Sequence, residues 1–154
     1  MWTISQGGSQ IPVCREVDVL VIGSGPAGSA AAITAARSGA KTLLVDLMSV
    51  PGGISTAGLM SHYTGSVESA LYQEVLQRMK ENDESPVAGV PKTVIDPTSM
   101  TLTWIELLEE TGADLLLYTM ACEAVVEDGK IRGVILQNKS GRSAVFAKVV
   151  IDAT

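Results

Sequence analysis

Charge clusters and cysteines are scarce in this sequence, and each scarcity excludes a class of protein. The 154 residues carry a net charge of −6 without any cluster of Lys or Arg, so neither nucleic acid nor an anionic membrane is an expected partner. The two cysteines, Cys14 and Cys122, lack C-x-x-C spacing, which argues against a disulfide framework, a redox dithiol and an iron–sulfur site built by this chain. Cys122 falls in a predicted strand and is expected to pack in the core. We therefore expect a protein of the reducing cytoplasm.

Long apolar runs are also missing, although 46% of the residues are hydrophobic. Residues 19–36 carry no charge, but a Gly-Ser-Gly-Pro sequence breaks the run, so a strand followed by a helix fits better than a membrane span. The first residues lack the basic and apolar regions of a secretory signal. The apolar content has two explanations that the sequence leaves open: a core rich in Ala and Val, or a surface that meets a second domain or subunit.

Residues 17–46 contain the motif around which the chain is organised. Residues 19–22 form a continuous apolar run, which is typical of a strand buried on both faces of a parallel sheet. The sequence G-x-G-x-x-G follows at Gly23, Gly25 and Gly28. Gly23 permits a tight turn, and Gly25 lets the backbone approach a pyrophosphate. Gly28 allows a helix to pack closely on the strand. The N-terminus of that helix offers N–H groups and a positive dipole end to the pyrophosphate.

A second apolar strand ends at Asp46, which lies 18 residues after Gly28. An acidic side chain at this place can accept hydrogen bonds from the ribose hydroxyls of a dinucleotide. Because strand, turn, helix and acid all agree, the sequence predicts a dinucleotide site rather than a purely structural turn. The acid also argues against NADP, whose 2′-phosphate would meet a carboxylate.

The letters GSGPAG and the later stretch PGGISTAGL at residues 51–59 resemble the FAD-binding segment of FAD-dependent oxidoreductases. More narrowly, they resemble the bacterial heterodisulfide reductase A-like group, in which a G-G-x-x-T-A-G loop runs along the flavin. Asp96-Pro97, the turn at residues 138–141 and the closing strand at residues 149–154 are also similar to that group, so the resemblance covers residues 11–154. It implies FAD as the cofactor and an α/β, Rossmann-like FAD-binding domain. That domain has a parallel sheet with helices on its faces and a three-stranded antiparallel β-meander.

The motif and the resemblance together give candidate cofactor-binding residues, most of them in loops or near strand ends: Gly23, Gly25, Pro26, Ala27, Gly28, Asp46, Gly52, Gly53, Thr56, Ala121, Ala153 and Thr154. The glycine turn with Pro26 and Ala27 holds the pyrophosphate. The resemblance implies that the loop ending at Thr56 lines the pyrophosphate and flavin, and that the main chain of Ala121 contacts adenine. Ala153 and Thr154 are expected to face the cofactor because ligands bind at the carboxyl ends of strands in open α/β sheets. No metal site is expected.

The remaining sequence divides into an arm and a domain. Residues 1–12 are polar and predict a flexible arm, and residues 13–154 predict the domain. Apolar residues at helical spacing predict a helix over 67–82, followed by a mobile loop over 83–92. Asp96 and Pro97 predict the start of another helix, which Gly112 ends.

The last third of the sequence predicts strands. An apolar run at 115–118 is the expected third parallel strand. Strands at 121–126 and 130–137 flank an Asp-Gly turn, which is a strong hairpin signal. A strand at 143–149 completes the meander, and a separate strand at 149–153 is expected to be the fourth parallel one.

His62 is the only histidine and follows the glycine-rich loop that the resemblance places along the flavin. A lone histidine is more often structural than catalytic, so His62 is a weak candidate for a role near substrate or flavin. The sequence offers no convincing general acid or base. Catalysis therefore needs residues that this chain does not contain.

We expect the FAD-binding amino-terminal part of an FAD-dependent oxidoreductase, with flavin-mediated hydride or electron transfer on an unknown substrate. Two departures from the family pattern matter: Asp46 stands where Glu is usual, and the substrate domain with its second Gly-Asp segment is missing. We therefore expect weak FAD binding, no turnover by this chain alone, and a second chain or domain over the flavin side. The alternatives are a non-catalytic dinucleotide-binding module, a truncated fragment that cannot hold flavin, and an NAD-dependent Rossmann enzyme.

Overall fold

The computed structural model describes residues 2–60, 62, 68–82 and 94–154. Within these residues, seven strands and three α-helices follow one another with one short 3-10 helix: β1 Thr3–Gln6, β2 Ser9–Ile22, α1 Pro26–Arg37, β3 Thr42–Val45, η1 Gly53–Ser55, α2 Ala70–Asn82, α3 Pro97–Thr111, β4 Asp114–Leu116, β5 Met120–Glu127, β6 Lys130–Asn138 and β7 Gly141–Asp152. The predicted loop over 83–92 and residue 67, the first of the helix predicted over 67–82, lie outside the described residues, and that helix begins at Ala70. No helix in the described part of the chain is long and apolar enough to cross a membrane.

One sheet of seven strands forms the frame, in the order β4-β3-β2-β7-β6-β5, with β1 paired to β2. Strands β4, β3, β2 and β7 are parallel, whereas β7, β6 and β5 form an antiparallel meander. The α/β Rossmann-like fold with a meander, predicted from the sequence, is therefore confirmed. The last two predicted strands are wrong in one respect, because residues 141–152 form the single strand β7, which pairs with β6 and also with β2.

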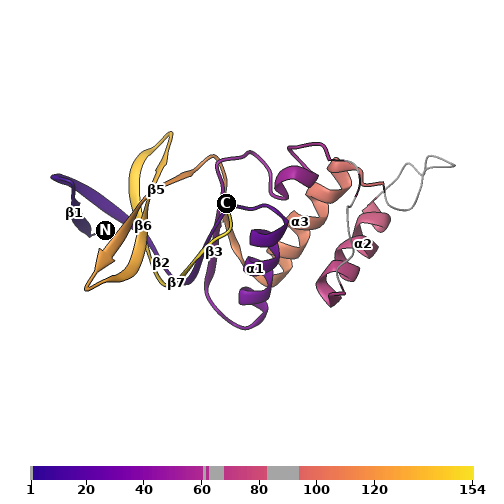
Figure 1. The fold of residues 1–154 in the computed structure, drawn as a ribbon, viewed down its shortest axis with the longest axis horizontal. Coiled ribbons are helices and arrows are strands. Elements are labelled where there is room, and N and C mark those ends of the chain that lie inside the picture. The colour runs from indigo at the N-terminus through magenta and orange to yellow at the C-terminus, as the bar shows by residue number, and fades with distance from the viewer. Residues whose placement is uncertain (1, 61, 63–67, 83–93) are drawn as a thin grey trace.

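The parallel strands are buried on both faces, as their continuous apolar runs predict. Val21 and Leu44 face a core cluster that they share with α1, α2 and α3, while Leu20 and Leu43 belong to a second cluster made of strand residues only. The three helices therefore gather on one face and at one end of the molecule, and the meander and β1 lie toward the other end (Figure 1). This arrangement leaves the loops after β2 and β3 together at the carboxyl edge of the parallel strands.

The predicted flexible arm is instead a β-hairpin. Strand β1 pairs antiparallel with the first residues of β2 through a turn at Gly7 and Gly8, both of which have positive φ. Ile11 is 1% exposed in a cluster with strands β5, β6 and β7, and the Trp2 ring lies 5.1 Å from that of Phe146. The segment is ordered because its alternate residues reach apolar partners more than a hundred residues away in sequence.

In the meander, the turn between β5 and β6 forms as predicted, but Cys122 is not buried as predicted. Asp128 and Gly129 both have positive φ, as a type I′ turn between β5 and β6 requires. Cys122 lies in β5 as predicted, but its side chain is exposed rather than in the core, because β5 is the last strand of the sheet and few of its residues are covered.

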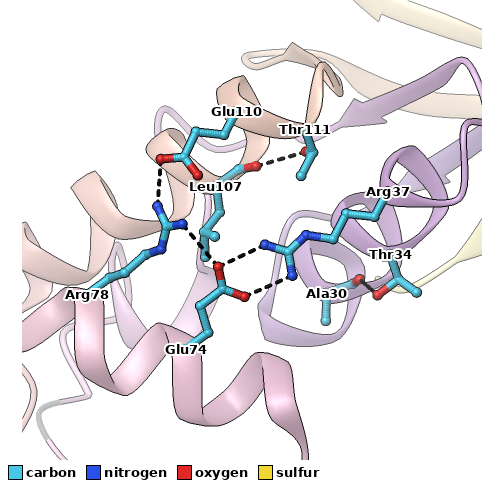
Figure 2. Close-up of polar contacts among 8 residues, drawn as sticks. All are labelled: Ala30, Thr34, Arg37, Glu74, Arg78, Leu107, Glu110 and Thr111. Carbon is cyan, nitrogen blue, oxygen red and sulfur yellow. Dashed lines mark hydrogen bonds and ion pairs between the residues drawn. The ribbon is translucent and has the colours of Figure 1, made fainter.

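Helix α3 begins and ends where the sequence predicts. The Asp96 carboxylate accepts a 2.6 Å hydrogen bond from the N–H of Ser99, and Gly112 ends the helix with a φ of +73°. An ion network then joins the three helices: Glu74 of α2 receives both N–H arms of Arg37 at 2.8 Å, and Arg78 bridges Glu74 and Glu110 (Figure 2). The network fixes α2 against α1 and α3 on the face of the sheet that carries the glycine turn.

Candidate cofactor-binding site

The glycine turn between β2 and α1 is too closely packed for side chains at two of its glycines. A Cβ on Gly28 would lie 1.7 Å from the carbonyl oxygen of Gly23, so the helix sits directly on the end of the strand. Gly23 has a φ of +92°, and a Cβ there would lie 2.7 Å from the Ala153 carbonyl oxygen and 3.0 Å from the Thr154 nitrogen. The turn and the end of β7 are therefore in contact, and the predicted approach of Ala153 and Thr154 to the cofactor stays a prediction.

Gly25 differs from these two glycines because the protein itself does not require it. Its φ of −59° and ψ of 178° suit any residue, and an added Cβ would meet no atom within 4 Å. Gly25 is the N-cap of α1, no side chain caps the helix, and its first turn holds no acidic residue. The exposed Pro26 and Ala27 follow. The N-terminus of α1 therefore faces open space with uncapped N–H groups, which is the arrangement that binds phosphate.

Asp46 points back to this turn from the end of β3. One carboxylate oxygen, Oδ2, accepts hydrogen bonds from the N–H of Ser24 and, at 2.8 Å, from its hydroxyl. The other oxygen, Oδ1, accepts from the Met48 N–H at 2.7 Å. The predicted ribose-binding acid and the glycine turn are thus brought together, and the acid is held in one orientation.

The loop after Asp46 packs against the glycine turn. The N–H of Gly52 donates to the Ser24 carbonyl oxygen at 2.6 Å, and a Cβ on Gly53 would lie 2.9 Å from the Gly25 Cα. Thr56 is 2% exposed, and its hydroxyl donates to the Pro51 carbonyl oxygen at 2.7 Å, so its side chain holds the loop in shape. The two glycines of this loop therefore lie beside the N-terminus of α1, and the contacts of the loop with pyrophosphate and flavin stay predictions.

A small cavity lies between this loop and the start of α3. Its volume is about 220 Å³, and its lining is mostly apolar: Val50, Thr56, Ala57, Pro97, Thr98, Thr101 and Leu102. Trp104 of α3 lies under the same loop, and a Cβ on Gly52 would lie 2.8 Å from its ring. Its indole N–H is buried without a hydrogen-bond partner among the described residues.

The entry to β5 is tied to the end of β3. The Thr119 N–H donates to the Asp46 carbonyl oxygen at 2.9 Å, and the Asp46 N–H donates to the Leu116 carbonyl oxygen at 3.0 Å. Ala121 follows two residues later and is half-buried against the strand-only cluster. Its contact with adenine stays a prediction.

Two further titratable residues, His62 and Asp152, are also described. His62 is exposed, and its backbone forms an isolated bridge with Val94; its role near the flavin stays a prediction. The N–H and hydroxyl of Thr154 donate to Asp152 at 3.1 and 2.8 Å and hold the pKa of that carboxyl below its ordinary value. Asp152 therefore adds negative charge at the end of β7, on the side of the site away from Asp46.

Sequence reasoning missed Ser24, which occupies an unspecified position of the motif. The side chain is 0% exposed and its polar groups contact three separate segments. The signal available in the sequence was a small residue with a hydroxyl group, placed between two glycines of a turn that the motif brings close to an acidic residue.

Comparison with known proteins decides the family. The profile of the family described as FAD dependent oxidoreductase matches residues 18–154. This chain belongs to the FAD-dependent oxidoreductases. The predicted family, the cofactor FAD and the assignment as an oxidoreductase domain are thereby confirmed, whereas the narrower heterodisulfide reductase A-like resemblance stays a prediction.

Individual relatives show how much of a flavoprotein is present. The chain is 30% identical over 151 residues to the thiamine thiazole synthase of Methanococcus vannielii, a match that covers 90% of this chain and 56% of the relative. Two solved structures share the fold: the THI4 protein of Thermovibrio ammonificans, and the glycerol-3-phosphate dehydrogenase of Bacillus halodurans, which was solved with FAD. The THI4 protein has a TM-score of 0.63 and 22% identity, and the match covers 90% of this chain and 57% of that protein. The dehydrogenase has a TM-score of 0.62 and 20% identity, and the match covers 90% of this chain and 34% of that protein. The chain thus spans about a third to a little over half of these proteins.

Proposed function

We propose that the carboxyl edge of the parallel strands holds FAD in an extended position. The pyrophosphate lies at the N-terminus of α1, the adenosine ribose lies at Asp46, and the flavin side follows the loop that begins at Gly52. The observation that carries this assignment concerns Gly25. Its backbone conformation and its surroundings would accept a side chain, so the protein itself does not require glycine there, and we attribute the glycine to the space that a ligand needs. The fit is consistent with a dinucleotide, because an uncapped helix and a carboxylate lie on the two sides of the same turn.

The proposed activity is oxidoreduction on a substrate that the rest of the parent protein binds. Bound FAD accepts and donates a hydride or single electrons. The residues of this chain would bind and orient the cofactor: N–H groups in the first turn of α1 would stabilise the negative charge of the pyrophosphate, and Asp46 would hold the ribose. No described residue is placed to move a substrate proton, so turnover requires groups that lie elsewhere.

We also propose that a second domain or chain covers the flavin side of the site. Apolar side chains are exposed on the glycine loop and on the neighbouring face of α3: Ile54 is 60% exposed, Leu59 71% and Leu102 46%. Leu102 also lines the small cavity beside Thr56. Water contact at such a surface is unfavourable, so burying it against a partner would stabilise the assembly.

The cytoplasm is the proposed compartment. Cys14 and Cys122 are both exposed free thiols, which suits a reducing environment and would favour oxidation outside one.

The proposed site can be tested by incubating the purified chain with FAD, desalting it and recording the visible absorption spectrum. A retained flavin band supports the whole site, and the matched variant Gly25→Val should lose it while keeping its melting temperature. A colourless wild-type protein that binds ADP by calorimetry would confine the site to the adenosine half. Binding of neither ligand would contradict the proposal.

A further inference from the structure

Ser24 connects three segments that a bound dinucleotide would have to contact. Its N–H and its hydroxyl both donate to Asp46 Oδ2, the hydroxyl at 2.8 Å. Its carbonyl oxygen accepts from the Gly52 N–H at 2.6 Å and from the Ser29 hydroxyl at 2.9 Å. The acid, the glycine loop and α1 therefore meet at one fully buried residue.

These bonds limit what the Asp46 carboxylate can still accept. An ionised carboxylate offers about four lone-pair positions, two on each oxygen. Ser24 occupies both positions on Oδ2, and the Met48 N–H occupies one on Oδ1. One position therefore remains open, on Oδ1. Three fixed donors also prevent the carboxylate from rotating to present its other oxygen.

We propose that Ser24 is a positioning residue that orients Asp46 so that it accepts a single ribose hydroxyl through Oδ1. This inference rests on the proposed function, because it assumes that Asp46 faces the ribose. It deepens that function by fixing the stoichiometry of the contact: one hydroxyl of the adenosine ribose is recognised by Asp46, and the other is not.

The test compares the binding of ADP, 2′-deoxy-ADP and 3′-deoxy-ADP to the full chain by calorimetry. For the wild-type protein, only one of the deoxy analogues should bind more weakly than ADP, by about ten- to a hundredfold, because a hydrogen bond to a charged group is lost. Asp46→Ala should bind all three ligands alike. Ser24→Ala keeps the two backbone donors but opens one position on Oδ2, which can then accept a second ribose hydroxyl, so the preference for ADP over the sensitive analogue should fall at least about threefold.

Ser29→Ala is the matched control. It also removes a buried hydroxyl that contacts Ser24, but it leaves the three donors to Asp46 in place. It should keep the wild-type preference. If Ser24→Ala does not fold, Ser24→Cys retains the side-chain volume with a much weaker donor, and should show the same loss of preference.

Three results would overturn the inference while leaving the ADP site intact. These are equal losses with both deoxy analogues, no loss with either, or a wild-type preference in Ser24→Ala and Ser24→Cys accompanied only by a lower melting temperature. A wild-type chain that binds no ADP would instead overturn the proposed function and this inference together.

Discussion

Strands β2 and β7 each run through two regions of the molecule, and glycine serves a different purpose in each region. Near the carboxyl ends of the strands, four glycines are so closely packed that an added Cβ would lie less than 3.0 Å from another atom. The distances are 2.7 Å for Gly23, 1.7 Å for Gly28, 2.4 Å for Gly52 and 2.9 Å for Gly53. At the distal end, the turn glycines Gly7, Gly8, Gly129 and Gly141 have positive φ and no atom within 4 Å of an added Cβ. The site glycines lack space for a side chain, and Gly23, Gly52 and Gly53 also have positive φ, whereas the distal turns need glycine for backbone conformation alone.

Two glycines do not follow this division, and each is informative. Gly133 is distal yet crowded, because a Cβ there would lie 2.3 Å from the carbonyl oxygen of Val145 on the neighbouring strand β7. Gly25 is in the site yet has neither crowding nor positive φ. Gly133 shows that close packing of neighbouring strands also requires glycine. Gly25 shows where the space beside a glycine is available to a ligand rather than filled by the protein.

The largest effect is expected from Gly28→Ala. The new methyl group would overlap the Gly23 carbonyl oxygen, so α1 could not seat on β2, and the free energy of unfolding should fall by on the order of 3–5 kcal/mol. Urea denaturation followed by circular dichroism measures it. Gly25→Ala, three residues earlier in the same turn, is the control and should unfold like the wild type. A Gly28→Ala protein as stable as the wild type would show that lack of space does not explain the glycine at this position.

Gly25→Val should separate binding from folding. Its side chain projects into the open space before α1, so the affinity for ADP should fall by more than about tenfold while the melting temperature stays within a few degrees. Calorimetry and thermal unfolding check the two halves of the prediction. Thr34→Val, a β-branched replacement on an exposed position of α1, should change neither. Equal loss of stability and affinity would mean that Gly25 has a structural role.

Gly129→Ala tests the distal turns. The cost should be about 1 kcal/mol, since the strain lies only in the positive φ of +73°. Gly129→Asn should recover part of it, because Asn tolerates the left-handed region better than Ala does. Chemical denaturation of the pair decides between them. An Asn variant as unstable as the Ala variant would indicate crowding at this turn.

The smallest effects concern ion pairs, where the two regions also differ. Hydrogen bonds from Arg37, and then its charge and that of Arg78, hold the pKa of Glu74 below its ordinary value of 4.5 (Figure 2). A carboxylate whose pKa is lowered by folding stabilises the protein above its unfolded pKa, and this stabilisation disappears as the pH falls through the folded pKa. Glu74→Gln should therefore cost up to about 1 kcal/mol at pH 7 and progressively less below about pH 4.5.

Glu123→Gln is the distal counterpart. Glu123 pairs with Arg142 on the open face of the meander, with both side chains more than a third exposed, and its loss should cost less than that of Glu74 at every pH. Denaturation midpoints between pH 3 and pH 7 compare the two variants. A larger cost for Glu123→Gln would reverse the expected order of the two regions.

The sequence predicted the features that local chemistry determines. Gly23 to Gly28, the Asp-Gly turn and the Asp96 cap each follow from the preferences of a few neighbouring residues. The β1 hairpin was missed although Gly7-Gly8 is a turn signal, because its stability comes from residues such as Ile135 that are distant in sequence. Cys122 was placed in the core because apolarity does not show which strand lies at the edge of the sheet.

Ser24 illustrates why the site itself was only partly predictable. The motif names the glycines because their requirement is steric and independent of the rest of the chain. The contact between Ser24 and Asp46 arises only when two strands and two loops are assembled. Residue types at single positions do not encode such a meeting.

The 14 residues of β2 form one strand, which spans roughly 46 Å at about 3.3 Å per residue, with a shift of its register against β7 between Val13 and Arg15. Its two ends are the Gly7-Gly8 turn and the glycine turn of the cofactor site, so the hairpin and the site lie at opposite ends of the same strand (Figure 1). A dye or a surface linker joined to residues 7–8 would therefore stand well away from the proposed nucleotide site. The hairpin tip is the natural attachment point for immobilising the protein in a flavin-binding sensor.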